Sequence, residues 1–130
     1  MAQENTSVRR VQGGGIARGT QTKTANYTLT EADTGQIIIA NAVDLVFTLP
    51  PTADGLWFGF AVKAPSASTG LQISPNSVDK IFGNGFTSVD NKDAINTAAT
   101  DREGDFLAVI GDGLDGWYIV DVVGTWAREP

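Results

Sequence analysis

The sequence predicts an all-β fold, either an antiparallel β-sandwich of jelly-roll type or a small barrel, preceded by an extended N-terminal arm. From residue 24 onward, short apolar runs are broken by turn residues roughly every 8 to 12 positions, which is typical of these folds. No stretch after Gly35 carries a helical period of useful length. The 130 residues correspond to one domain, and a hydrophobic fraction of 42% is enough for a folded core.

Residues 1–22 are expected to form a flexible basic arm, and residues 23–130 the β-sandwich body. The arm is polar, has no period and contains Gly13-Gly14-Gly15. Residues 1–24 carry 4 basic and 1 acidic side chains (4 − 1 = +3), and residues 25–130 carry 5 and 14 (5 − 14 = −9), which sum to the net charge of −6. This division suggests that the arm contacts something acidic; a solvated tail that offsets the field of the body is the alternative.

The first expected strand covers residues 24–30. Thr30-Glu31-Ala32-Asp33 then matches a helix-capping signature, which predicts a single helical turn that ends at Gly35. Residues 36–40 contain consecutive isoleucines and are expected to form a strand covered on both faces. Residues 44–49 alternate cleanly, and Pro50-Pro51 ends them because proline cannot donate to a β-ladder.

The strand over residues 56–63 is expected to place its core side chains on one face and Trp57 on the other. Its core residues are Leu56, Phe58, Phe60 and Val62. Further strands are expected at 71–73, 78–82, 86–89, 94–100, 105–110 and 116–123. The last two are joined by a loop with two Asp–Gly steps, which predicts a β-hairpin.

The composition excludes several kinds of chemistry. The chain has no cysteine and no histidine, which rules out disulfides, zinc–thiolate sites, cysteine nucleophiles and a Ser-His-Asp triad. We therefore predict a protein that is not an enzyme and needs no cofactor or metal. No apolar segment reaches the roughly 18 residues that span a bilayer, so we expect no membrane partner. The acidic body argues against nucleic acid as a partner, because neutralising phosphates requires clustered Lys and Arg.

Two acidic groups resemble functional motifs. Residues 112–116 suggest a calcium loop but lack the alternating oxygen ligands and the terminal Glu of an EF-hand, so a hairpin turn is preferred. Asp101, Glu103 and Asp105 could serve a carboxylate-based glycosidase, but spacing within one loop does not establish the separation that this chemistry needs. A solvated turn is the preferred interpretation.

Two tryptophans are candidates for a subunit interface. Trp57 lies opposite the core face of its strand and should be exposed or at an interface, where aromatic side chains are frequent anchors. Trp126 follows Gly124 near the C-terminus, where an aromatic side chain is usually held against another surface.

Several segments carry a resemblance through their order and spacing. They are Tyr27-Thr28-Leu29-Thr30-Glu31-Ala32-Asp33-Thr34-Gly35, Phe47-Thr48-Leu49-Pro50-Pro51, Ile73-Ser74-Pro75, Asp79-Lys80-Ile81-Phe82-Gly83, Gly104-Asp105, Gly116-Trp117-Tyr118-Ile119-Val120 and Gly124-Thr125-Trp126. Together, over residues 22–126, they resemble small β-modules of tailed-bacteriophage virion proteins, which include capsid decoration (cement) proteins, head fibres and tail-fibre tips. The resemblance implies an assembly role, often as a homotrimer, and transfers no catalytic residue.

We therefore expect a capsid decoration protein that binds the outer surface of the virion head and stabilises it by bridging subunits of the major capsid protein. The short chain, without a coiled-coil heptad, favours the capsid over a fibre shaft. The capsid-contact residues would be Val8, Arg9, Arg10, Val11 and Arg18, with strand addition by residues 8–11. The alternative is a tail-fibre or head-fibre module for attachment or receptor binding.

Overall fold

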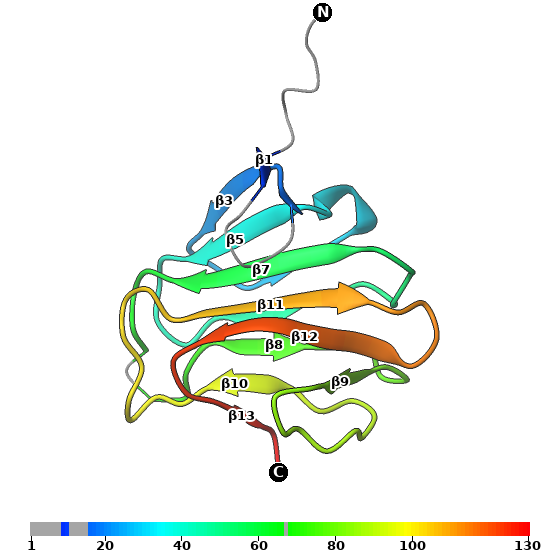
Figure 1. Ribbon diagram of the computed structural model, residues 1–130. Coiled ribbons are helices and arrows are strands. Elements are labelled where there is room, and N and C mark those ends of the chain that lie inside the picture. Colours follow the sequence, from blue (N-terminus) through cyan, green and yellow to red (C-terminus); the bar gives the residue numbers. More distant parts are fainter. Residues whose placement is uncertain (1–8, 11–15, 67) are drawn as a thin grey trace, which may run out of the picture.

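The computed structural model describes residues 9–10, 16–66 and 68–130, and over them the protein is a sandwich of two β-sheets (Figure 1). One sheet has six strands and the other has five, and neither closes into a barrel. A separate antiparallel pair is formed by β1 (Arg9–Arg10) and β2 (Ile16–Ala17). The expected all-β sandwich is confirmed.

The six-stranded sheet contains, in spatial order, β3 (Gly19–Lys23), β5 (Gln36–Ala40), β7 (Trp57–Val62), β11 (Phe106–Gly111), β12 (Gly116–Val123) and β9 (Lys80–Phe82). The five-stranded sheet contains β13 (Trp126–Arg128), β10 (Ala94–Asn96), β8 (Gln72–Ser74), β6 (Val46–Thr48) and β4 (Tyr27–Thr28). A 3₁₀ turn, η1 (Glu31–Asp33), lies between β4 and β5.

From β3 to β8 the chain winds as a coil, because each successive strand joins the sheet opposite to the one before it. The strands that then meet within one sheet run in the same direction: β3, β5 and β7 are parallel, and so are β4, β6 and β8. Antiparallel pairing begins with β10, β11 and β12, while β9 is parallel to β12. The expectation of a purely antiparallel sheet is therefore wrong. When the chain crosses through the opposite sheet between two neighbouring strands, both strands run in the same direction. Two neighbouring strands that are joined by a hairpin run in opposite directions.

Equivalent positions of the coil stack on one another. Tyr27 pairs with Phe47, and Phe47 pairs with Ile73, so the inward side chains of β4, β6 and β8 lie in one row. Beyond the strand ends, the Leu29 N–H donates to the Thr48 carbonyl oxygen at 2.8 Å, and the Leu49 N–H donates to the Ser74 carbonyl oxygen at 2.8 Å. This stacking continues the ladder into the turns and aligns successive coils.

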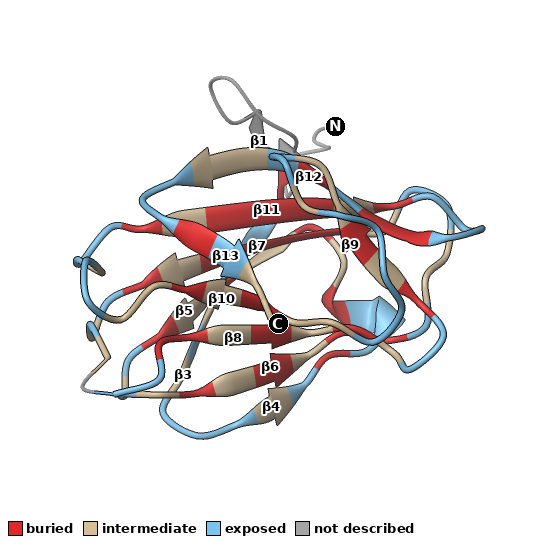
Figure 2. Ribbon diagram, turned by 90° about the horizontal axis from the view of Figure 1, so that it is seen from below, coloured by how far each residue is buried: buried red, intermediate tan, exposed pale blue. Residues whose placement is uncertain are grey.

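The core lies between the two sheets, where the buried parts of most strands meet (Figure 2). Phe47 from one sheet stacks on Phe60 from the other, with ring centroids 6.0 Å apart, and Phe58 lies 5.5 Å from Trp117. Phe58, Phe60 and Val62 are buried as predicted, and Leu56 is half-buried at the start of their strand.

The helical turn predicted before Gly35 is confirmed as η1. The Asp33 N–H donates to the Thr30 carbonyl oxygen at 3.0 Å, which closes the turn. The Thr30 N–H donates to Asp33 Oδ2 at 2.9 Å, the hydrogen bond of a capping box in which the N3 side chain accepts from the N-cap residue. Gly35 ends the turn at φ +82°, a conformation that glycine adopts without strain.

The first strands differ from the prediction. Residues 19–22, assigned to the arm from the sequence, belong to β3, so the expected boundary at residue 22 falls inside a strand of the sheet. The strand expected at 24–30 is reduced to β4, and residues 86–89 form no strand but contribute one bridge, between Gly83 and Phe86. β3 escaped prediction because its side chains are polar, and its pairing with β5 depends on tertiary context.

Gly70 and Gly55 have the same backbone conformation but differ in the space around them. Gly70 and Gly55 both have φ +84°, but a Cβ on Gly70 would collide with the carbonyl oxygen of Asn96, whereas nothing lies within 4 Å of one on Gly55. Gly55→Ala should cost about 1 kcal/mol of unfolding free energy through the backbone alone. Gly70→Ala should cost about 3 kcal/mol or more, because the clash with rigid backbone adds to that strain. Urea denaturation of both variants measures the difference; equal losses would contradict the close packing at Gly70.

Candidate functional site: the outer face of the six-stranded sheet

The outer face of the six-stranded sheet carries cross-strand rows of apolar side chains. In the first row, Trp57 pairs with Ile110, Ile110 pairs with Tyr118, and Tyr118 pairs with Phe82. The rings of Phe82 and Tyr118 meet edge to face, with centroids 5.5 Å apart. An apolar row therefore crosses β7, β11, β12 and β9 on the side of the sheet that faces away from the core.

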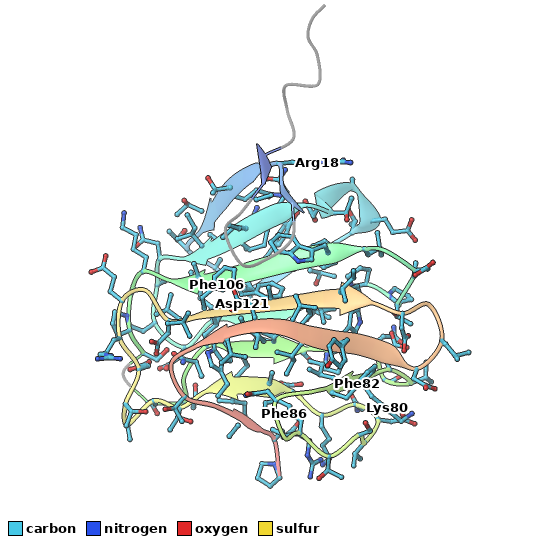
Figure 3. The ribbon with its side chains drawn as sticks, viewed as in Figure 1. Arg18, Lys80, Phe82, Phe86, Phe106 and Asp121 are labelled. Atoms are coloured by element: carbon cyan, nitrogen blue, oxygen red, sulfur yellow. The ribbon has the colours of Figure 1, made fainter. Side chains whose placement is uncertain are left out.

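Two further rows follow along the strands. The second contains Ile37, Gly59, Ala108 and Asp121, and the third contains Ile39, Ala61, Phe106 and Val123. A Cβ on Gly59 would lie 2.9 Å from Cζ of Phe106, so the Phe106 ring lies over this glycine. Figure 3 shows Phe106 and Asp121 close together on this face. The glycine gives the ring a flat site, which is the usual reason for pairing an aromatic residue with a strand glycine.

The outer face of the five-stranded sheet is different. Its outward positions are mostly polar, with Thr28, Thr48, Gln72 and Ser74 beside the half-buried Val46 and Ile95, and they alternate with buried residues. A sheet with one solvated face normally shows this polar alternation. The apolar outer face of the six-stranded sheet is therefore a candidate surface for cover by further segments of the chain or by a partner.

Part of this cover comes from the N-terminal region. Ala17 of β2, with 9% of its surface exposed, forms a second apolar cluster with Trp57 and Ala108, beside the half-buried Ile37 and Ile110. Trp57 lies on the face opposite the core, as predicted. The sequence predicts that it is exposed or at an interface. Only 8% of its surface is accessible, so the exposure is wrong, and its contact with a second subunit stays a prediction. Its Nε1 has no hydrogen-bond partner among the described residues.

Trp126 is mostly buried in the described fold. It is 6% exposed and packs in the main core, and its Nε1 donates to the Val123 carbonyl oxygen at 3.0 Å. The indole therefore holds the C-terminal strand against the end of β12. This burial leaves little of the side chain for a subunit contact, and the interface role of Trp126 stays a prediction.

The predicted capsid-contact residues are only partly described. Arg9 and Arg10 pair with Ala17 and Ile16 through their backbones, and their side chains, together with Val8 and Val11, lie outside the described residues.

Arg18 is exposed at the edge of the sheet next to β3 (Figure 3). Its N–H donates to the Gly35 carbonyl oxygen at 2.6 Å, and its aliphatic stem lies over Gly35, where a Cβ would be 2.9 Å from the Arg18 Cγ. The stem of Arg18 is thereby packed at the edge of the sheet, next to β3.

Asp33 attaches β3, the strand next to the arm, to the body. Its Oδ1 accepts from Gln21 Nε2 at 2.8 Å, and its Oδ2 accepts from the Tyr27 hydroxyl at 2.9 Å and from the Thr30 N–H. Burial opposes its ionisation, but these hydrogen bonds and the charge of Lys23 outweigh burial and lower the pKa of Asp33. Lys23 Nζ also lies 3.7 Å from the centre of the Tyr27 ring, a cation–π contact that closes the group.

Other carboxylates hold turns in the same way. Asp44 Oδ1 accepts from the N–H groups of Ser68, Thr69 and Gly70, at 3.3, 3.0 and 3.2 Å. Burial works against ionisation here too, but these donors and the Ser66 hydroxyl lower the pKa of Asp44. The group closes the loop between β7 and β8 onto the loop before β6.

Most of the acidic residues singled out in the sequence accept hydrogen bonds that shape turns, whereas Glu103 is exposed. Asp112 Oδ1 accepts from the N–H groups of Leu114, Asp115 and Gly116 and so shapes the predicted hairpin turn. Asp105 is 2% exposed and its Oδ2 accepts from Asn96 Nδ2 and the Arg102 N–H.

Asp101 accepts a hydrogen bond from the Ser66 N–H at 2.7 Å.

Within the described residues no three His, Cys, Asp or Glu side chains gather closely enough to hold a metal ion. In the same part of the chain, no helix is long and apolar enough to cross a membrane.

Neither the protein-family models nor the curated proteins searched contain a match to this chain.

The hydrogen bonds to Asp33 predict an acid-dependent loss of stability. Because folding lowers the pKa of Asp33, its stabilisation is complete above the unfolded value of about 3.9 and is lost as pH falls through the lower folded value. Asp33→Asn should reduce the free energy of unfolding by about 1 to 2 kcal/mol at neutral pH, and the gap to the original protein should narrow below about pH 4.

Urea denaturation at a series of pH values measures this effect. Glu31→Gln, which changes an exposed carboxylate of the same turn, is the control and should leave stability within about 0.5 kcal/mol. If the difference in unfolding free energy between Asp33→Asn and the original protein widened on acidification, folding would not lower the pKa of Asp33.

Proposed function

We propose that this protein is a bacteriophage capsid decoration protein, which binds the outer surface of the head and stabilises it by bridging subunits of the major capsid protein. The observation that carries the proposal is the apolar outer face of the six-stranded sheet, crossed at one side by the N-terminal segment at Ala17. A surface of this kind suits permanent attachment to other protein. The resemblance to virion β-modules supplies the assembly in which such attachment occurs.

The distribution of charge supports the same role. Residues 1–24 carry a net +3 (4 − 1) and the remainder −9 (5 − 14). In the described part of the chain a single ion pair is present, between Lys80 Nζ and Asp90 Oδ1 at 2.7 Å, so most charges of the body remain available to the field around it. The basic end would then bind acidic groups of the capsid, while the acidic body keeps copies from associating at random.

The structure of the turns supports a mechanical role rather than a chemical one. Asp105 accepts hydrogen bonds from the Arg102 N–H of its own loop and from Asn96 Nδ2 at the end of β10. Asp112 accepts from three N–H groups of its own turn. Loops fixed in this way resist deformation, which is what a clamp across subunit junctions requires. Several weak contacts per copy would then act together, because each becomes intramolecular once the first has formed.

Variants that remove the arginine charges of the arm test the proposal. Replacing Arg9, Arg10 and Arg18 by Gln should weaken binding to purified heads that lack this protein by about tenfold, because three exposed charge contacts of about 0.5 kcal/mol each amount to about 1.5 kcal/mol. Binding of the original protein should also weaken as salt is raised, since the contacts are electrostatic. Sedimentation of the protein with heads measures both effects.

The matched control replaces Lys63, Arg102 and Arg128 by Gln, which removes the same charge from the body and should preserve binding. Equal binding by the arm variant and the original protein would contradict the proposed arm contact. Failure of the original protein to bind heads, combined with binding to host-cell surfaces or saccharides, would favour the fibre attachment module instead.

A further inference from the structure

The turn that follows β9 contains the one Asn–Gly step of the chain, Asn84–Gly85. The Phe86 N–H donates to the Gly83 carbonyl oxygen at 2.9 Å, and the same two residues form an antiparallel bridge. Asn84 has φ +52° and Gly85 has φ +81°, which are the left-handed values of a two-residue type I′ hairpin turn. Because this turn favours Asn followed by Gly, the step has a structural reason to be present.

The same step is arranged so that it can react with itself. The main-chain nitrogen of a residue after Asn can close a five-membered ring on the Asn side-chain carbon, and glycine has no Cβ to obstruct this attack. Asn84 and Gly85 are both exposed, and a Cβ on Gly85 would have nothing within 4 Å. Within the described residues the Gly85 N–H has no hydrogen-bond acceptor. The attacking nitrogen is therefore free, and the turn has room to rotate.

Three Asp–Gly steps elsewhere in the chain could close the same ring, but the structure opposes each of them. Their glycine N–H groups already donate hydrogen bonds: Gly55 to the Gly111 carbonyl oxygen at 3.1 Å, Gly113 to Thr52 Oγ1 at 3.3 Å, and Gly116 to Asp112 Oδ1 at 2.9 Å. An ionised carboxylate is also a poorer electrophile than a carboxamide, because its negative charge repels the attacking nitrogen. The described structure thus distinguishes Asn84 from the other steps of this kind.

We propose that Asn84 is a site of spontaneous deamidation to isoaspartate, independently of the proposed capsid role. The Gly85 main-chain nitrogen loses its proton to solvent and bonds to Asn84 Cγ, the Cγ–Nδ2 bond breaks, and ammonia leaves. Water then opens the resulting succinimide ring. Cleavage of the bond from the ring nitrogen to Cγ gives aspartate, and cleavage of its bond to the main-chain carbonyl carbon gives isoaspartate. Nothing is oxidised or reduced, and water is the only co-reactant.

Isoaspartate would open the turn, because its main chain runs through Cβ and Cγ and is longer by one carbon atom. The hydrogen bond from Phe86 to Gly83 depends on the original length of the turn. Phe86 packs against the main core, and Phe82, which enters the turn from β9, meets Tyr118 edge to face. Each conversion also adds a negative charge to a chain whose net charge is already −6.

Ageing of the folded protein at mildly alkaline pH tests the site, with peptide mass spectrometry measuring the loss of each asparagine amide. Asn91 is the control within the same molecule, since it is exposed and has φ +59° but precedes Lys92 instead of glycine. We expect the Asn84 amide to be lost at least about tenfold faster, which corresponds to a barrier lower by about 1.4 kcal/mol. Equal rates, or an unchanged Asn84 while a peptide of residues 80–90 converts, would overturn the proposal.

The isoaspartyl form itself tests the opening of the turn. Its added charge separates it from the original protein by ion exchange, and an isoaspartyl methyltransferase distinguishes it from the aspartyl form. Asn84→Asp is the matched control, since it carries the same charge on a main chain of ordinary length. We expect the near-UV circular dichroism of the Phe82–Tyr118 contact to be reduced in the isoaspartyl form and retained in Asn84→Asp. Identical near-UV spectra of the two forms would contradict the opened turn.

Discussion

Apolar side chains project from both faces of the six-stranded sheet, and exposure of either set to water costs free energy. The inward set, which includes Phe58 and Phe60, meets the five-stranded sheet and forms the core. The outward set begins with Trp57, which Ala17 covers, and ends with Tyr118, which is half exposed. Because burial of apolar surface is the main driving force in folding and association alike, the exposed part of this face is a candidate site for contact with another molecule.

The same sheet also needs a rigid frame, which the acidic residues provide. Asp33 and Asp44 each accept several hydrogen bonds, and both have a lowered pKa because the donors outweigh the cost of burial. Their negative charge thus serves local structure at neutral pH, while the body as a whole keeps a strong negative field. Asp93 is the exception: burial and then the charge of Glu129 raise its pKa despite a hydrogen bond from Ser74. Its ionised form therefore weakens the fold slightly, at the edge where β10 meets β13.

Much of the fold could be predicted from the sequence, because strand alternation and turn chemistry are local. Phe58 and Phe60 were placed in the core by their period, and Gly35 was recognised as the end of a helical turn. The coil of parallel strands could not be predicted in this way, since alternation identifies a strand but not its neighbours. A repeat of Thr28-Leu29 at Thr48-Leu49, followed by residues that pair in register, was the signal for it. The burial of Trp57 depends on Ala17, a contact distant in sequence that no local pattern encodes.

We propose that the apolar outer face attaches this protein to the outside of a capsid. Cryo-electron microscopy of intact particles tests it most directly. We expect density for the two-sheet body on the outer surface of the head, across junctions between capsid subunits, with the Ala17 side of the six-stranded sheet against the shell. Density at the tip of a fibre, or a head-bound body with the whole outer face of this sheet exposed to solvent, would contradict it.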